Sequence, residues 1–239
     1  MGKKRNAQTQ NETHYEAPVT LEEHPFYDLQ LDEDQKRFRD AIWNENIDIV
    51  FCNSKAGTGK TLVAVGTANL LVKYGKFKQL IYVTSPCNEH RLGFMPGTSA
   101  EKSAFYYEPL YSALNSLGIN AYTAIQPDNI AEQKYSDGYI KPMTDVFLRG
   151  CNLEDAIIVI EEMQNHTVEI CKKILTRVCK NTKVVCIGHT GQNDLKVKSD
   201  SGFARYIQHF ANKNDDRVAV CELTKSHRSW VAQWADELE

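Results

Sequence analysis

Long apolar runs are missing from this chain of 239 residues. The longest, such as residues 156–160 and 184–187, fall far short of the roughly 18 to 20 residues that a helix needs to cross a bilayer. No apolar stretch follows the basic cluster at residues 3–5, so the amino end does not look like a signal peptide. We therefore expect a protein with no membrane partner that works in the cytoplasm.

Paired cysteine spacing is also missing. The chain has seven cysteines, an odd number, and no C-x-x-C pair. Zinc sites need paired ligands, and disulfide frameworks use an even set of cysteines. We expect all seven to be reduced, buried thiols.

Neither sign of charge is in excess. Lysine and arginine number 28 against 31 aspartates and glutamates, which gives a net charge of −3. With 42% hydrophobic and 10% aromatic residues, the composition is that of an ordinary globular protein, which excludes collagen-like, coiled-coil and wholly disordered classes. The net charge does not decide for or against nucleic acid, because binding depends on a local patch.

Regular patterning is confined to one long segment. Residues 1–28 have no apolar period and are rich in polar side chains, so we expect a flexible amino-terminal arm. Residues 29–239 are expected to form one domain. Five apolar segments alternate there with helical patterns, which predicts an α/β fold with a mostly parallel sheet and helices on both faces. The expected strands are residues 47–51, 80–84, 156–160, 183–187 and 218–223, and the expected helices are near residues 34–44, 62–74, 102–117, 167–179, 201–211 and from 229 onward.

A glycine-rich loop follows the first expected strand. Residues 54–61, SKAGTGKT, match the P-loop pattern except that Ser54 stands at its first glycine. Successive backbone N–H groups from Gly57 to Thr61, including those of Thr58 and Gly59, can wrap a β-phosphate at the start of the next helix. In this pattern Lys60 reaches the β- and γ-phosphates, and the Thr61 hydroxyl binds Mg²⁺. Nucleotide binding is the strongest inference from the sequence.

Two carboxylates follow the strand at residues 156–160. Ligands bind at the carboxyl ends of strands in open α/β sheets, so Glu161 and Glu162 are expected beside the P-loop. Phosphoryl transfer to water needs one carboxylate at the metal and one at the attacking water, and we assign these roles to Glu161 and Glu162 respectively. The plain alternative is a solvated acidic strand end. Gln192, just past the next strand, could contact the γ-phosphate or the attacking water, or could simply lie in a polar turn.

Taken in order, these segments resemble the PhoH family of P-loop ATPases, and within it the phage-type members. The resemblance covers roughly residues 31–239. Besides residues 54–61 it is carried by LGFMPG at 92–97, YEPLY at 107–111, LRG at 148–150, EEMQN at 161–165, LTR at 175–177, GHTGQNDL at 188–195 and SGF at 201–203.

The resemblance implies a single RecA-like domain whose five strands lie in the order 5-1-4-3-2. It implies an ATPase that uses Mg²⁺, is helicase-like, acts with single-stranded RNA or DNA, and assembles as a homo-oligomeric ring such as a hexamer. A phage-encoded member would work in the host cytoplasm.

Individual roles are also implied by the resemblance. Gln35 stands where such ATPases read adenine, and Gln192 where they sense the γ-phosphate. Arg177 and Arg228 are candidates for stabilising the transition-state charge, and an arginine acting from a neighbouring subunit would explain assembly.

Four positions depart from the family pattern. Ser54 replaces a glycine, Ser85 an arginine, Glu161 an aspartate and His189 an aspartate. We expect Ser54 to hold its turn at some strain, with binding preserved. The key residues Lys60, Thr61, Glu162 and Gln192 remain, so we expect hydrolysis that is slow or stimulated rather than absent.

Two other functions fit parts of the sequence. A nucleotide-gated scaffold with little turnover would suit the departures, and a small-molecule kinase would suit the P-loop but has no use for a water-polarising Glu162. For nucleic acid, the sequence offers one candidate surface, which could equally be core packing: Arg91, Phe94, Lys102, Tyr106 and Tyr107.

Overall fold

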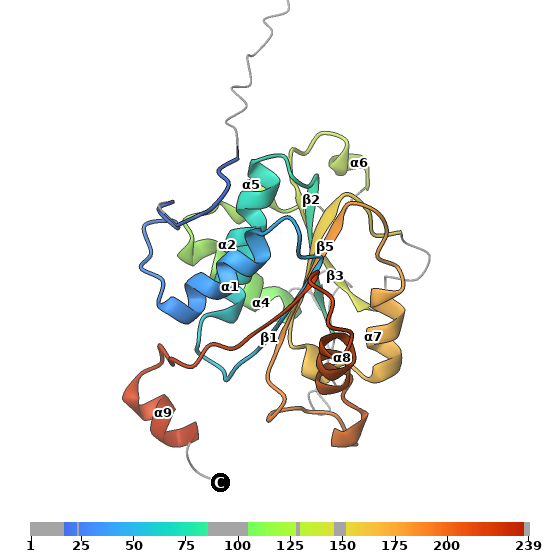
Figure 1. The fold of residues 1–239 in the computed structure, drawn as a ribbon. Helices are drawn as coiled ribbons and strands as arrows, with labels where there is room; N and C mark the ends of the chain where they lie inside the picture. Colours follow the sequence, from blue (N-terminus) through green and yellow to red (C-terminus); the bar gives the residue numbers. More distant parts are fainter. Residues whose placement is uncertain (1–16, 23, 86–104, 128–129, 146–151, 237–239) are drawn as a thin grey trace, which may run out of the picture.

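A six-stranded, wholly parallel sheet forms the centre of the computed structural model, which describes residues 17–22, 24–85, 105–127, 130–145 and 152–236 (Figure 1). The spatial order is β3-β2-β4-β5-β1-β6. The five expected strands lie in the expected order, and β3 is added at the edge beside β2. The strands are β1 Ile49–Asn53, β2 Gln79–Thr84, β3 Ile140–Thr144, β4 Ala156–Ile160, β5 Thr182–Gly188 and β6 Val218–Cys221.

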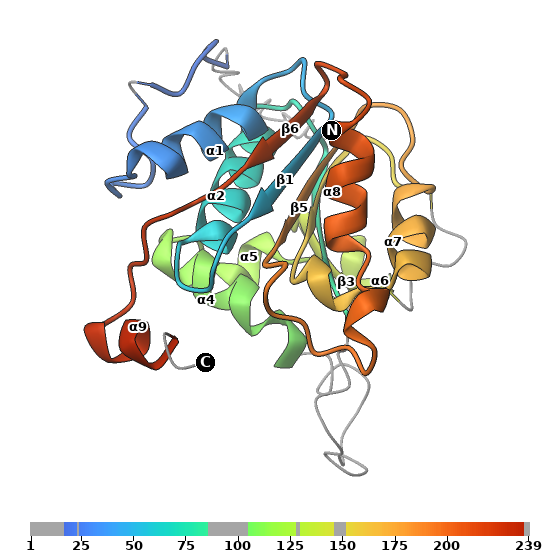
Figure 2. The ribbon, with the colours of Figure 1, turned by 60° about the horizontal axis from the view of Figure 1, so that its bottom comes forward.

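Helices cover both faces of the sheet, as expected. The ribbon shows α1, α2, α4 and α5 on one face and α7 and α8 on the other, while α9 lies apart from both layers (Figures 1 and 2). The helices are α1 Glu33–Trp43, α2 Lys60–Lys73, α4 Glu108–Ser116, α5 Ala121–Ala124, α6 Ile130–Gln133, α7 Val168–Leu175, α8 Phe203–Ala211 and α9 Trp230–Asp236, with short 3₁₀ turns at Phe105–Tyr107, Met163–Asn165 and Lys198–Asp200.

Each central strand is buried on both faces, which is why it reads as a continuous apolar run. In β1, Val50 and Cys52 pack against the α1, α2 and α4 layer, while Ile49 and Phe51 pack against the α7 and α8 layer. β4 is buried along its whole length. The register pairs Val50 with Val185 and Val185 with Val159, so the carboxyl ends of β1, β5 and β4 reach the same edge of the sheet.

Part of the expected flexible arm is packed against the domain, so that expectation is wrong for the described residues before 29. Leu21 and Phe26 are buried in the core beside α1 and α2. The Trp43 indole donates to the carbonyl of Pro18 at 3.1 Å, and the Tyr27 hydroxyl donates to the carbonyl of Gly66 at 3.1 Å. These apolar side chains are isolated in a polar stretch, so no periodicity revealed them.

The described cysteines are all free, as expected, but not all are buried. Cys52, Cys171 and Cys186 lie in the core, Cys221 is half-buried and Cys179 is exposed. Cys87 and Cys151 lie outside the described residues. No helix in the described part of the chain has the length and apolar character needed to span a membrane.

Replacing Phe26 with alanine tests the packing of the segment before α1. Phe26 is 3% exposed and its ring lies against Gly66 of α2, where a Cβ would come within 2.6 Å of the ring. We expect Phe26→Ala to lower the free energy of unfolding by about 3 to 5 kcal/mol in urea denaturation. Val19→Ala is the matched control, because Val19 is 94% exposed. Equal stability of the two variants would show that this segment does not pack.

Candidate nucleotide-hydrolysis site

The loop between β1 and α2 has the backbone of a phosphate cradle. Gly57 and Gly59 both adopt left-handed backbone, with φ of 81° and 85°, which other residues rarely do. A Cβ at Gly59 would come within 2.7 Å of the Gln35 amide nitrogen, so the loop also needs glycine for space. α2 begins at Lys60, directly after the loop, so its free N–H groups and its dipole favour an anion here.

The Lys60 ammonium is held inside the loop. Its Nζ donates to the carbonyls of Ser54 at 2.6 Å and Lys55 at 2.7 Å. Burial lowers the pKa of Lys60, while the charges of Glu162 and Glu161 oppose that shift. A phosphate that entered the loop would offer this ammonium a stronger, charged partner than either carbonyl.

Ser54 is accommodated without left-handed backbone, so the expected strain at this position is not found. Its side chain is 3% exposed, and its Oγ accepts a hydrogen bond from the Leu223 backbone N–H at 2.5 Å. The hydroxyl therefore ties the loop to the segment after β6, a link that glycine could not make.

Thr61 and Glu161 meet across 100 residues of sequence. The Thr61 hydroxyl donates to Glu161 Oε1 at 3.1 Å, and the Tyr82 hydroxyl donates to Glu161 Oε2 at 2.9 Å. Burial, together with the nearby Glu162 carboxylate, raises the pKa of Glu161 to about 7. A divalent cation would offset both effects, so this oxygen pair suits Mg²⁺.

Protein ligands for such a cation are few. Within the described ranges, no group of three or more His, Cys, Asp or Glu side chains is placed to hold a metal. Mg²⁺ normally keeps several waters and uses one or two protein oxygens with substrate phosphates, so Thr61 and Glu161 are sufficient.

Glu162 is fixed in an unusual conformation at the end of β4. Its backbone is left-handed, with φ of 49°, which is uncommon for a residue other than glycine. The Gln164 amide nitrogen donates to Glu162 Oε2, and Gln164 Oε1 accepts from the His189 backbone N–H at 3.0 Å. Gln164 thus links Glu162 to the end of β5. Sequence reasoning gave Gln164 no role, although it lies inside the EEMQN motif.

A cavity of about 340 Å³ joins these groups. Lys60, Thr61, Glu161, Glu162 and Arg228 line it together with α4. No residue of α4 was predicted from the sequence to belong to the site, although Pro109 of the YEPLY motif lines the cavity. The α4 residues are Pro109, Ser112, Ala113 and Ser116.

The segment after β6 brings Arg228 to the P-loop. The His227 backbone N–H donates to the Gly57 carbonyl at 2.9 Å. The Arg228 side chain lies directly on Gly57, where an added Cβ would come within 2.3 Å of Arg228 Cγ. Arg228 can therefore reach a phosphate in the loop from within the same chain.

Gln35 clamps the P-loop from α1. It is 4% exposed, its Nε2 donates to the Thr58 carbonyl at 3.0 Å, and its Oε1 accepts from the Asp32 N–H at 3.1 Å. His227 Nε2 lies 3.1 Å from Gln35 Nε2 and 3.0 Å from Asp32 Oδ2. Adenine reading by Gln35 stays a prediction.

Gln192 lies at the surface beyond β5. Its Nε2 donates to Asp236 Oδ1 of α9 at 3.2 Å, and the Lys55 ammonium lies 3.5 Å from Asp236 Oδ2. α9 therefore bridges the P-loop and the residue expected to sense the γ-phosphate.

Arg177 is not brought to this site. Its carbonyl accepts from the Leu153 N–H at 3.0 Å, just before β4 begins, so it lies at the amino-terminal edge of the sheet. The P-loop is at the opposite edge. Arg177 can therefore contact a nucleotide only if that nucleotide belongs to another subunit.

The candidate nucleic-acid surface is only partly described. Arg91, Phe94 and Lys102 lie outside the described residues, as do residues 148–150. Tyr107 is 9% exposed and belongs to the core cluster, and Tyr106 packs against that cluster. The two tyrosines therefore serve packing.

Comparisons with known proteins identify the family of this chain. The family model described as PhoH-like protein matches residues 30–238. PhoH-like proteins of Mycobacterium leprae and Bacillus subtilis are 37% and 35% identical over 77% and 75% of this chain. These matches cover 50% and 53% of the relatives, so the chain spans about half their length.

A solved structure shares the fold. The large terminase of a thermophilic bacteriophage aligns over 82% of this chain and 46% of its own, with a TM-score of 0.51 and 13% identity. The family match spans nearly all of the region that forms the sheet and the loop. The chain belongs to the PhoH family.

Proposed function

We propose that this chain binds ATP and hydrolyses it to ADP and phosphate with Mg²⁺. The observation that carries the proposal is the contact between Thr61 and Glu161, which brings a hydroxyl and a buried carboxylate together beside Lys60 in one cavity. Bound Mg²⁺ would neutralise charge on the β- and γ-phosphates. Membership of the PhoH family supports the same reaction class.

Binding would rest on the loop and on Lys60. The N–H groups at the start of α2 and the two left-handed glycines form the cradle. Lys60 would exchange its two carbonyl partners for phosphate oxygens, while Gln35 and His227 hold the loop in place.

Hydrolysis would use Glu162 to orient and polarise the attacking water. Its carboxylate is held by Gln164 at the cavity wall, next to Lys60 and Arg228. Arg228 would stabilise the charge that develops on the γ-phosphoryl oxygens. Gln192 does not line the cavity, so to sense that phosphate it would have to exchange its bond to Asp236 for one to the phosphate.

We also propose single-stranded RNA or DNA as a partner and a homo-oligomer as the working state. Family membership supports the first. The position of Arg177, which can contribute to catalysis only from a neighbouring subunit, is consistent with the second.

Phosphate release from Mg²⁺-ATP tests the hydrolysis proposal. We expect turnover by the wild type that rises with single-stranded RNA or DNA, and a loss of about 10² to 10⁴-fold in Glu162→Gln, because the water loses its polarising group. Glu162→Gln should still bind ATP, whereas Lys60→Ala should not. Lys36→Ala, on the exposed side of α1, is the control. If ATP binds but the wild type releases no more phosphate than Glu162→Gln, the chain is a nucleotide-gated scaffold.

Arg228→Met tests whether Arg228 acts on the transition state. Methionine keeps an unbranched apolar stem against Gly57 and removes the charge. We expect kcat to fall by about 10³-fold with a smaller change in KM for ATP. Lys225→Met is the control, because Lys225 is an exposed cation three residues away. A kcat within about twofold of the wild type would remove Arg228 from the catalytic set.

Gln35→Ala tests adenine reading against loop clamping. Loss of the Thr58 contact alone would lower the affinities for ATP and GTP equally, whereas loss of a contact to the base would lower the affinity for ATP more. We expect the ratio of ATP to GTP affinity to fall by about tenfold, measured by equilibrium titration with Mg²⁺. An unchanged ratio with weaker binding of both nucleotides would assign Gln35 to the loop alone.

A further inference from the structure

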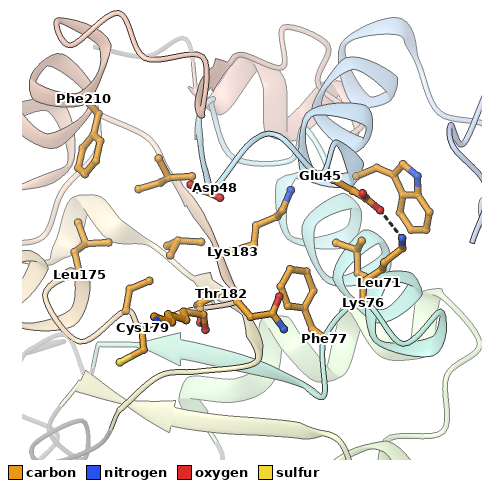
Figure 3. Close-up of a pocket in the computed structure, with 16 residues that line it drawn as sticks. Glu45, Asp48, Leu71, Lys76, Phe77, Leu175, Cys179, Thr182, Lys183 and Phe210 are labelled. Carbon is orange, nitrogen blue, oxygen red and sulfur yellow. Dashed lines mark hydrogen bonds and ion pairs between the residues drawn. The ribbon is translucent and has the colours of Figure 1, made fainter.

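A second cavity, of about 620 Å³, opens at the amino-terminal edge of the sheet, opposite the P-loop (Figure 3). It lies where β1 and β5 begin and where α1 and α2 end. None of the residues assigned to nucleotide binding or hydrolysis lines it. Its walls are largely apolar and are built by Trp43, Ile49, Leu71, Phe77, Leu175 and Phe210.

A buried ammonium faces this cavity. Lys183 of β5 is 4% exposed, and its Nζ donates to the Asn44 carbonyl at the end of α1 at 2.5 Å. Figure 3 shows its side chain running toward the space between Glu45 and Asp48. An ammonium has three N–H donors, and the Asn44 carbonyl satisfies one of them.

The nearby carboxylates do not neutralise Lys183. Within the described ranges, no carboxylate oxygen lies within 4.0 Å of its Nζ. Glu45 pairs instead with Lys76, and Asp48 lies 3.9 Å from an Arg217 guanidinium nitrogen. Burial lowers the pKa of Lys183 to about 8, although the charges of Asp48 and Glu45 oppose that shift.

The charge around the cavity is positive. Lys76, Lys180 and Lys183 line it against Glu45 and Asp48. A buried cation without an ion-pair partner is unfavourable, and an anion that brought its own apolar body would relieve that cost without exposing the walls to water.

We propose that this cavity binds an amphiphilic monocarboxylate, a molecule with a hydrocarbon or aromatic body and one carboxylate. The body would lie against Leu71 and Phe77, on the α1 and α2 side of the sheet that Lys183 also faces, and the carboxylate would accept hydrogen bonds from Lys183. The volume falls within the roughly 300 to 1,000 Å³ of known small-molecule pockets. This site does not depend on the nucleotide function proposed above.

The role of Lys183 at the end of α1 does not account for this arrangement. A lysine that only capped the last carbonyls of α1 would need no cavity beside it, and its ammonium would be better placed in water. The ligand also differs from a nucleotide, because this edge has neither a glycine loop nor a helix amino terminus among its lining residues.

Fluorescence quenching of Trp43 tests the site directly. The chain has three tryptophans, and the double variant Trp230→Phe/Trp234→Phe leaves Trp43 alone to report from the cavity wall. A terminally brominated undecanoate, kept below its micelle concentration, is titrated into the full chain. We expect saturable quenching by the undecanoate. The neutral brominated alcohol of the same length should bind with an affinity about tenfold lower in the same titration.

Variants locate the carboxylate. Lys183→Met should lower the affinity for the undecanoate by about tenfold and leave the affinity for the alcohol unchanged. Lys36→Met, on the exposed surface of α1, should change neither affinity. Circular dichroism checks that each variant is folded. If Lys183→Met does not fold, the proposal is tested by the difference in affinity between the acid and the alcohol alone. Equal binding of acid and alcohol, or no saturable quenching of Trp43, would overturn the proposal.

Discussion

The hydrogen bond from the Thr61 hydroxyl to Glu161 depends on the order and register of the central strands. The two residues lie at the start of α2 and just past the end of β4, and β5 lies between β4 and β1 in the sheet. The parallel register aligns the carboxyl ends of β1, β5 and β4. A shift of one residue in that register would move the side chains of a strand to the opposite face of the sheet. The Tyr82 hydroxyl of β2 donates a hydrogen bond to the second oxygen of the Glu161 carboxylate. Two strands, β2 and β4, and one helix, α2, thus converge on a single carboxylate.

A second set of contacts holds the P-loop from both directions along the chain. From the carboxyl-terminal side, the Leu223 N–H donates to Ser54 and the His227 N–H donates to Gly57. From α1, Gln35 donates to the Thr58 carbonyl. Residues 223–228 therefore form a strap over the P-loop that also delivers Arg228. Ser54, which departs from the family pattern, is one of the anchors of this strap. The Ser54 hydroxyl thus makes a hydrogen bond that a glycine at this position could not make.

The features predicted from sequence were those with a strong local signal. The five apolar strands, the P-loop and the carboxylates after β4 each rest on a short run of neighbouring residues, which a sequence displays directly. β3 was not predicted because its sequence, IKPMT, is short, half-polar and contains Pro142. The proline is tolerated because β3 is an edge strand. The strap and the cavity beside Lys183 could not be predicted, because they depend on contacts between distant segments. Gln164 lay within a recognised motif, yet its link to His189 needed the neighbouring strand.

The place of β6 in the sheet has a consequence for synthesis on the ribosome. Of the described strands β6 is made last, yet it pairs with β1, and Ile49 aligns with Val218. Until that strand and the strap emerge, β1 has an open edge and the P-loop lacks its Leu223 and His227 contacts. A chain truncated before residue 218 would still contain β1, β2, β4 and β5, but it would lack both of the backbone contacts that anchor the P-loop from the carboxyl-terminal side.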